Sequence, residues 1–396
     1  MGTRRIKYGG AITGLEEERA IIKSIKKSRI TRNWQEAEEG KIFSSEAAKF
    51  LGVKYGVLTN SGSSAGLLAL SALELPKGSE VIISAVTFPT IFNIILQCGL
   101  VPVVVDAKVG TYGFSIEDVE KAITKKTGAI IAIHPLGNPV DMPGLMKLVK
   151  KHEKETKQKI WVLEDNCDGW GSEIGGKSVG SFGDISITSF HAAHIVSMGV
   201  GGGVFTNVAE LAKRTRMYRD WGRQADINKS ENKKHKTLPQ DYNPRFIYEK
   251  IGYNFQILEL QAAMGRVQLR KTAHIKKARK KNFDYLYKNL SKYPLQLPLW
   301  AKNADVCWFS FPITYDGDRG KLLRHLEKNG IETRPLFSGN ITRHPAYTED
   351  MYRISGILDE ADYITGHSFW LSCHPSLTKD DLEYIIKTFN DFFNEK

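Results

Sequence analysis

Residues 56–73 read GVLTNSGSSAGLLALSAL, a short β-branched run followed by a turn of small polar residues and an apolar segment. Small residues between a strand and a helix expose backbone N–H groups at the helix N-terminus, where the helix dipole favours an anion. The stretch therefore predicts a strand, a phosphate-binding turn over residues 60–65 and a helix. The alternative is a plain strand-to-helix turn with Ser63 or Ser64 as its N-cap.

Five further β-branched runs follow, separated by segments of helical character, up to about residue 210. This alternation is typical of an α/β fold with a parallel sheet. The six runs cover residues 56–58, 81–83, 103–105, 129–133, 160–163 and 185–188.

The second half of the chain has a different pattern. Residues 258–286 are rich in Ala, Leu and Arg and predict a long helix linking two lobes. A run at 309–313 and helices near 321–329 and 379–393 then indicate a small α+β domain. We expect a large domain over 1–260 and a small domain, with the linking helix, over 261–396. The polar, lysine-rich residues 223–244 predict a surface insertion in the large domain.

Composition excludes several classes of protein. The 396 residues are 41% hydrophobic and 25% charged, which is ordinary for a soluble globular protein. No apolar stretch reaches about 18 residues and the basic N-terminus precedes no apolar core, so we expect no membrane span and a cytoplasmic protein. The net charge of +12 attracts anions, but the basic clusters lack interleaved aromatic residues that stack bases, so we expect no nucleic-acid partner.

Two later stretches end predicted strands in reactive residues. Residues 163–168 read LEDNCD, and carboxylates at the C-terminal end of a parallel strand face the ligand crevice. Residues 188–194 read TSFHAAH and precede the glycine run 201–203, where a histidine can approach a ligand closely. The alternatives are a helix N-cap for Asp165 and a purely structural histidine.

Together these stretches resemble the fold-type I pyridoxal phosphate enzymes, and within them the DegT/DnrJ/StrS-type nucleotide-sugar aminotransferase and dehydratase family. Residues 60–65 resemble its phosphate turn, residues 87–90 its ring-stacking loop, and Glu164-Asp165 its cofactor-nitrogen acid. Residues 252–255 resemble the strand that crosses its dimer interface. The resemblance implies a three-layer αβα large domain with a mostly parallel sheet, a small C-terminal α+β domain, and a homodimer.

His194 stands where the aminotransferases of this family carry the lysine that binds the coenzyme covalently. Imidazole cannot make that linkage, but it transfers protons near neutral pH. Together with residues 136–139 and 333–343, the histidine at position 194 makes the sequence resemble the 3-dehydratase branch of the family. The resemblance implies removal of the C-3 hydroxyl from a nucleotide-linked 4-keto-6-deoxysugar, with His194 as the base and L-glutamate regenerating pyridoxamine phosphate. Such enzymes serve dideoxysugar biosynthesis for lipopolysaccharide O-antigens.

The cysteines separate two types within that branch. The CDP-linked type holds an iron–sulfur cluster with one Cys in E-D-N-C-D and three after R-D-W-G-R. Cys167 matches the first, but no Cys follows Arg223 until Cys307, and a [2Fe–2S] cluster takes four protein ligands. We therefore expect no metal cluster and prefer the GDP-linked type, with a CDP-linked substrate left open.

The resemblance also assigns roles to residues. Asp165 would pair with the ring nitrogen and Phe88 would stack on the ring. Asp168 stands where the aminotransferases often carry Gln beside the ring hydroxyl. The residues implied for the phosphate are Gly62, Ser63, Ser189 and Asn254 of the partner subunit; those for the sugar nucleotide are Arg219, Trp221, Arg334, Arg343 and His344.

Three points stay open at this stage. Gln256 departs from relatives that often carry Arg after Gly-Tyr-Asn-Phe. An aminotransferase using a displaced lysine, such as Lys177, is one alternative to the dehydratase. An inactive family member that only binds a sugar nucleotide is another.

Overall fold

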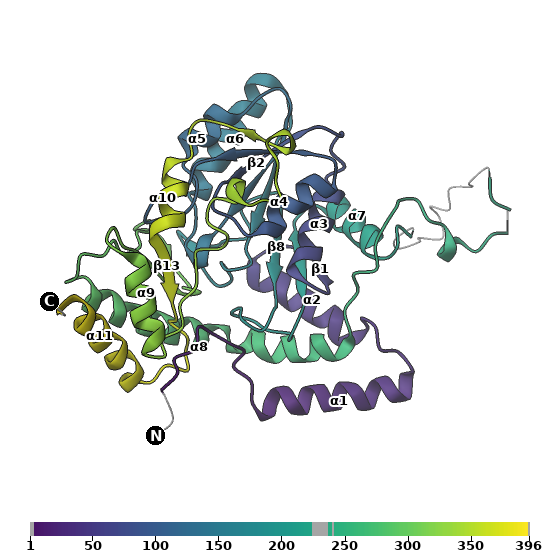
Figure 1. Ribbon diagram of the computed structural model, residues 1–396. Helices are drawn as coiled ribbons and strands as arrows, with labels where there is room; N and C mark the ends of the chain where they lie inside the picture. Colours follow the sequence, from purple (N-terminus) through teal and green to yellow (C-terminus); the bar gives the residue numbers. More distant parts are fainter. Residues whose placement is uncertain (1–3, 224–236, 240, 395–396) are drawn as a thin grey trace.

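The protein is described by a computed structural model that covers residues 4–223, 237–239 and 241–394. Its centre is an eight-stranded sheet with the strand order β1-β9-β8-β5-β4-β2-β3-β12 (Figure 1). Strand β9 runs antiparallel to both of its neighbours, and the remaining pairs are parallel. The strands of this sheet are β1 (Tyr55–Thr59), β2 (Glu80–Ser84), β3 (Val101–Val105), β4 (Thr127–Ile133), β5 (Trp161–Asp165), β8 (Ile185–Ser189), β9 (Gly202–Thr206) and β12 (Arg353–Ile354).

All six predicted runs are strands of this sheet, so the predicted mostly parallel α/β architecture is confirmed. The sequence analysis missed β9, because glycine has a low β propensity. A Cβ at Gly202 would lie 2.4 Å from the carbonyl oxygen of Ser61, so only glycine lets β9 pass this close to the phosphate turn.

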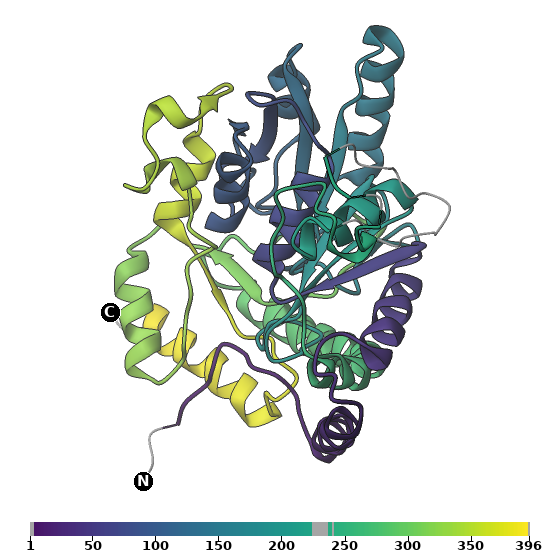
Figure 2. The same ribbon diagram turned by 90° about the vertical axis from the view of Figure 1, so that its right-hand side faces the viewer.

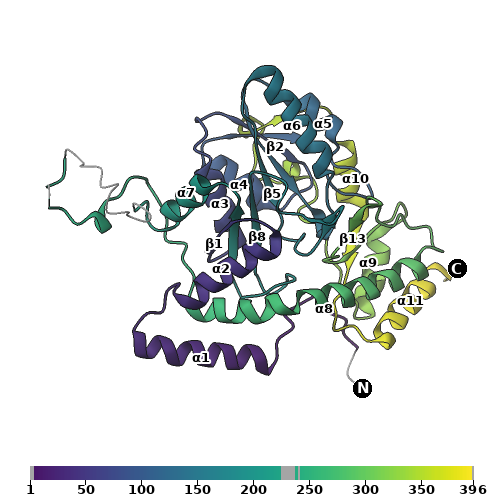
Figure 3. The ribbon, with the colours of Figure 1, turned by 180° about the vertical axis from the view of Figure 1, so that it is seen from behind.

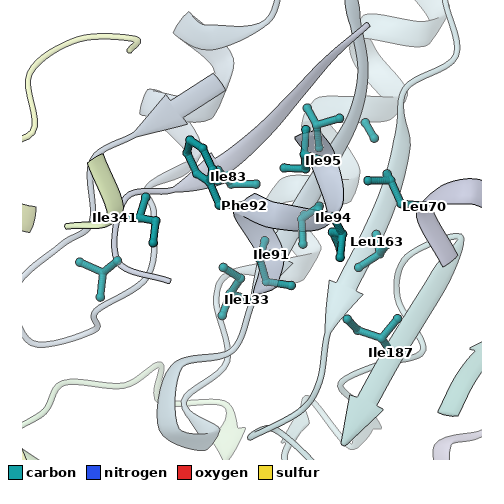
Figure 4. Close-up of a cluster of buried hydrophobic side chains, with 14 of the residues drawn as sticks. Leu70, Ile83, Ile91, Phe92, Ile94, Ile95, Ile133, Leu163, Ile187 and Ile341 are labelled. Carbon is teal, nitrogen blue, oxygen red and sulfur yellow. The ribbon is translucent and has the colours of Figure 1, made fainter. Parts of the chain in front are cut away.

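Helices cover both faces of the sheet, which gives three layers (Figure 2). Successive strand residues point to opposite faces, so Val81 and Ile83 pack with α3 and α4 while Ile82 packs with α5 and α6. Figure 4 shows the first of these cores, in which Ile94 of α4 lies near Leu163 of β5 and Phe92 of α4 lies near Ile83 of β2. The helices before residue 220 are α1 (Leu15–Thr31), α2 (Glu38–Leu51), α3 (Gly62–Ala72), α4 (Pro89–Gln97), α5 (Ile116–Ala122), α6 (Met142–Thr156) and α7 (Ala209–Arg219).

The long helix α8 (Glu259–Leu290) confirms the predicted linking helix. It packs against α1 and α2 near its start and against α11 near its end (Figure 3). The C-terminal part contains the antiparallel pair β11–β13 and its own apolar core. The remaining helices and strands are α9 (Arg319–Lys328), α10 (Asp359–His367), α11 (Lys379–Asn394), β6 (Glu173–Ile174), β7 (Lys177–Ser178), β10 (Ala304–Asp305), β11 (Phe311–Thr314) and β13 (Ser368–Leu371), with 3-10 turns at Pro135–Gly137, Pro244–Phe246, Ile341–Arg343 and Glu349–Met351.

The two cores do not divide the chain at the predicted boundary. Ile6 is 3% exposed and belongs to the core of the C-terminal part. Conversely, Leu336, Ile341 and Ile364 pack in the core of the large sheet, and β12 is its edge strand. Segments far apart in the sequence thus share each core, because sequence position does not determine which core a segment covers.

Part of the predicted insertion, residues 224–236 and 240, lies outside the described residues. Among the residues that are described, no helix is long and apolar enough to cross a membrane.

Candidate active site

A cavity of about 530 Å³ opens at the C-terminal ends of the parallel strands β4, β5 and β8. Ligands in open α/β sheets bind at this edge, because loops there bring side chains from several strands together. Of the residues predicted for the site, the cavity is lined by Gly62, Ser63, Phe88, Asp165, Asp168, Ser189, His194 and Arg334.

The turn between β1 and α3 forms one side of the cavity. Ser61 is the N-cap of α3, and its Oγ accepts a hydrogen bond from the N–H of Ser64 at 3.0 Å. The first intrahelical bond runs from the N–H of Ala65 to the carbonyl of Ser61, so the N–H groups of Gly62 and Ser63 precede the helical ladder. The alternative with Ser63 or Ser64 as N-cap was wrong, and the true cap leaves both N–H groups available for an anion.

The turn is packed tightly against the end of β8. A Cβ at Gly62 would lie 2.7 Å from the Cβ of Ser189, so glycine is required for this approach. The Oγ of Ser63 lies 2.9 Å from the side-chain oxygen of Thr90 at the start of α4. Hydroxyl groups of Ser63 and Ser189 thus flank the helix N-terminus.

Two carboxylates at the end of β5 point in opposite directions, because neighbouring strand residues alternate. Glu164 is fully buried away from the cavity and accepts hydrogen bonds from the N–H groups of Gly180, Phe182 and Gly183 at 2.6–2.7 Å. Asp165 faces the cavity and accepts one hydrogen bond from the N–H of Cys167 at 3.1 Å. Burial raises the pKa of the Asp165 carboxyl, and nearby Asp168 contributes to the same rise. A cationic N–H group in the cavity would complement this carboxyl.

His194 follows β8 and lies beside Asp168. Its Nδ1 is buried and 3.4 Å from Oδ1 of Asp168, in contact but without a well-directed hydrogen bond. The other oxygen of Asp168 accepts a hydrogen bond from the N–H of Leu136 at 3.3 Å. The imidazole ring also packs on Phe309, with 5.4 Å between ring centroids. The contact with Asp168 assigns Nδ1 to the carboxylate side and leaves Nε2 for the cavity.

Aromatic side chains form much of the remaining wall. Phe88 is the N-cap residue of α4 and is 56% exposed, which for a phenyl ring lining a cavity is an open stacking face. The sequence analysis missed Tyr8, Phe309 and Trp370, which come from the N-terminal segment and the C-terminal part. No local motif marks these three, because they join the cavity only through long-range packing.

His134 was also missed. It lines the cavity at the end of β4, with Nε2 3.3 Å from Oε2 of Glu164, and Nδ1 accepting from the N–H of Val140 at 3.4 Å. A histidine directly after a β-branched run is the signal that could have found it.

Four of the predicted sugar-nucleotide contacts lie outside this cavity. Arg219 has a buried guanidinium that pairs with Glu36 and Asp220 and donates to the carbonyl of Leu58. Of these partners, Glu36 and Leu58 lie far away in sequence, so no motif reveals the cluster.

The other three are surface residues of this protomer. Arg343 pairs with Asp362, with 2.9 Å between Nε and Oδ1, and Nε2 of His344 lies 2.8 Å from the carbonyl oxygen of Ser338. Trp221 is 36% exposed and adopts a left-handed φ of 60° beside the guanidinium of Arg223.

Asn254 is exposed outside the cavity, and its backbone faces Asp220. Gln256 donates to Oδ1 of Asp220 at 2.7 Å, in the cluster that holds Arg219. Lys177 lies on β7, 4.3 Å from the centroid of the Phe182 ring. No lysine of the described residues lines the cavity.

Cys98, Cys167, Cys307 and Cys373 are all free thiols. Cys167 lines the cavity, and burial raises the pKa of its thiol well above the ordinary value. Cys307 and Cys373 are fully buried outside it. Within the described ranges, no group of three or more His, Cys, Asp or Glu side chains is arranged to hold a metal ion.

The chain is similar to known proteins over nearly its whole length. The model of the DegT/DnrJ/EryC1/StrS aminotransferase family matches residues 15–390. The dTDP-4-dehydro-2,6-dideoxy-D-glucose 3-dehydratase of Saccharopolyspora spinosa is 37% identical over 99% of this chain and 87% of its own. Lipopolysaccharide biosynthesis protein RfbH of Salmonella typhimurium is 36% identical over 99% of this chain and 92% of its own. The structure of E. coli GDP-4-keto-6-deoxy-D-mannose-3-dehydratase with bound hydrated pyridoxal phosphate superimposes with a TM-score of 0.85, at 27% identity over 97% of this chain and 100% of that one.

The residues of the cavity fit pyridoxal phosphate. Two N–H groups at a helix N-terminus and two serine hydroxyls suit a phosphate, and the close approach of Gly62 to Ser189 leaves no room there for a side chain. The buried Asp165, whose pKa is raised, suits a protonated ring nitrogen, and Phe88 supplies a stacking surface. The predicted family is thereby confirmed, and the family implies pyridoxal or pyridoxamine phosphate as the coenzyme.

Proposed function

Because the chain belongs to the DegT/DnrJ/EryC1/StrS aminotransferase family, we propose that it is a coenzyme-dependent 3-dehydratase of a nucleotide-linked 4-keto-6-deoxysugar. One observation carries the proposal: His194, and no lysine of the described residues, lines the cavity that fits the coenzyme. Relatives named as 3-dehydratases at 37% and 27% identity support it.

The residues at the cavity wall would hold the coenzyme. Gly62, Ser63 and Ser189 bind the phosphate, Phe88 covers one face of the ring, and Asp165 keeps the ring nitrogen protonated. When bound, the coenzyme supplies a primary amine for the C-4 ketone of the sugar and a ring that accepts an electron pair. The apolar ring of Phe88 also limits access of water.

His194 is the proton-transfer group. With Nδ1 beside Asp168, its Nε2 takes a proton in the elimination and returns it to the C-3 oxygen as that oxygen leaves. Asp168 orients the imidazole and stabilises its protonated form. The sequence analysis placed Asp168 beside the ring hydroxyl of the coenzyme. In this proposal its carboxylate acts on His194 instead.

The overall reaction balances with glutamate as the reductant. The sugar loses its C-3 hydroxyl and gains a hydrogen, while glutamate is oxidised to 2-oxoglutarate and ammonia is released. The product is a 3-deoxy-4-keto sugar nucleotide. The similarity to RfbH supports a place in lipopolysaccharide dideoxysugar biosynthesis.

The nucleotide and the assembly are part of the proposal. The GDP-linked substrate preferred from the cysteine pattern has support in the E. coli relative, and the S. spinosa relative makes dTDP an equal candidate. The exposed position of Asn254 supports a homodimer in which Asn254 of the partner subunit completes the phosphate site. The molar mass in solution, measured by light scattering, tests the dimer.

The test combines product analysis with substitution of the base. The purified protein, loaded with pyridoxal phosphate and glutamate, is given GDP-, dTDP- and CDP-4-keto-6-deoxyhexoses, and the products are identified by mass spectrometry. We expect a 3-deoxy product, and His194→Lys should lower its formation by about 10²- to 10⁴-fold, the usual contribution of a general base. The same variant should retain coenzyme after borohydride reduction and denaturation.

Lys177→Ala is the matched control, because Lys177 lies outside the cavity and should leave dehydration unchanged. Unimpaired dehydration in His194→Lys would refute the role of His194. An amino sugar that disappears in Lys177→Ala would favour the displaced-lysine aminotransferase. A wild-type protein that binds no coenzyme would favour the inactive family member.

A further inference from the structure

Residues 4–12 form an extended segment, here called the N-terminal strap, that lies on the C-terminal part. The N–H of Ile6 donates to the carbonyl of Gly330 at 2.8 Å, and the N–H of Glu332 donates to the carbonyl of Ile6 at 3.0 Å. Gly330 has a left-handed φ of 73°, and a Cβ there would lie 2.0 Å from the carbonyl oxygen of Arg4. The strap is therefore held against backbone, with no room for a side chain at residue 330.

The strap carries Tyr8 into the wall of the cavity. The backbone N–H of Tyr8 donates to Oε2 of Glu332 at 3.2 Å, which fixes its position along the strap. Its ring meets Trp370 edge-on, with 5.9 Å between centroids and 73° between planes. The Cζ of Arg334 lies 4.3 Å from the centroid of the Tyr8 ring, within the range of a cation–π contact.

Arg334 supplies the one arginine or lysine side chain among the described residues that line the cavity. Its NH1 group donates to the carbonyl of Thr333 at 2.8 Å, and NH2 lies 3.9 Å from Oε2 of Glu332. That carboxylate is already engaged by the side chain of Arg5 and by the N–H of Tyr8. The Arg334 side chain is 44% exposed, so much of the guanidinium fork stays available to a ligand.

An arginine with free N–H groups binds carboxylates and phosphates, both of which match its planar fork. A long side chain at a half-exposed site samples many rotamers, and contact with an aromatic face reduces that number before the ligand arrives. The strap thus contributes to the cavity wall through Tyr8.

We propose that Tyr8 is a positioning residue whose ring holds Arg334 at the cavity wall as a subsite for a ligand oxyanion. The oxyanion is a carboxylate of the amino donor or a phosphate of the sugar nucleotide. The inference rests on the proposed function for these two ligands, and it is tested by binding to the protein without coenzyme.

The experiment titrates the full-length, coenzyme-free protein by calorimetry with 2-oxoglutarate and, separately, with GDP and dTDP. Tyr8→Leu should weaken binding of one probe class about two- to fivefold, as expected for loss of a cation–π contact at an exposed site. Arg334→Gln should weaken the same class about ten- to hundredfold, since a charge-assisted hydrogen bond is lost. Tyr8→Phe keeps the ring and should bind like the wild type.

The double variant tests whether Tyr8 acts through Arg334. If it does, adding Tyr8→Leu to Arg334→Gln should cause no further loss, whereas independent effects would multiply. Multiplied effects, a Tyr8→Phe variant as weak as Tyr8→Leu, or unchanged binding of both probe classes in Tyr8→Leu would overturn the proposal. Weakening confined to 2-oxoglutarate identifies the carboxylate, and weakening confined to the nucleotides identifies the phosphate.

Coenzyme binding is measured on the same variants by absorbance and should be unchanged. This measurement separates the proposal for Tyr8 from the proposed function. A wild type that binds the probes and no coenzyme would refute the proposed function alone.

Discussion

Replacing Gly202 by Ala should displace the turn between β1 and α3, which the proposed function assigns to the coenzyme phosphate. Gly202 begins β9, and a Cβ there would lie 2.4 Å from the carbonyl oxygen of Ser61 and 2.6 Å from the amide nitrogen of Gly62. Ordinary contact begins at 3.4 Å, so the backbone of the turn must move by about 1 Å. Crowding of this kind costs about 1–3 kcal/mol.

The assay separates binding from folding. If the cost falls on coenzyme binding, the dissociation constant for pyridoxal phosphate, measured by absorbance titration, rises about 5- to 150-fold. If the cost falls on the fold, urea titration shows a loss of about 1–3 kcal/mol in the free energy of unfolding. We expect both measurements to move, because β9 pairs with both β1 and β8 beside the turn.

Gly366→Ala is the matched control. Gly366 lies in α10, a Cβ added there would have no atom within 4 Å, and alanine in a helix is more favourable than glycine by about 0.8–1.0 kcal/mol. This variant should bind coenzyme normally and unfold no earlier than the wild type. A Gly202→Ala protein with wild-type affinity and wild-type stability would refute the steric reasoning.

Two predictions concern buried groups away from the cavity. Glu164→Gln should lower the free energy of unfolding by at least about 1–3 kcal/mol, because an amide cannot accept all the buried N–H hydrogen bonds that the carboxylate accepts. Urea titration measures this loss, with the exposed Glu120→Gln as the control. Equal losses in the two variants would contradict the prediction. Burial lowers the pKa of His374 from 6.5 to about 4, so the unfolded chain binds the proton more readily and stability should fall as the pH drops through that window. Unfolding midpoints at pH 7 to 4 should show a shallower dependence in His374→Gln, and identical slopes would count against the assignment.

Much of the fold follows from local sequence. The six β-branched runs became strands because each is short and apolar, and buried parallel strands have this composition. The long helix α8 follows from its helix-forming residues. The sequence did not predict strand β9. Its two glycines are there because neighbouring groups, residues 61 and 62 among them, lie too close for a side chain, and not because glycine favours a strand.

The candidate site likewise has a part that local sequence predicted and a part that it did not. Gly62, Asp165, Ser189 and His194 gather because each lies at or just after the end of a strand, and these strand ends meet at one edge of the sheet. The surroundings of Arg219 did not follow from the sequence, because its carboxylate partner Glu36 comes from a segment 183 residues away.

The sequence by itself determined the α/β class, the turn between β1 and α3, the acid at the end of β5 and the histidine where the family's aminotransferases carry a lysine. These depend on local patterning and on residue chemistry, both of which are written along the chain. Only the tertiary structure decided that Asp168 contacts His194, and that Tyr8 of the N-terminal strap contacts Arg334 and Trp370. Asp168 and His194 meet because the neighbouring strands β5 and β8 end side by side, and Tyr8 reaches Arg334 and Trp370 because the N-terminal strap packs on the C-terminal part. Neither arrangement follows from a short-range preference.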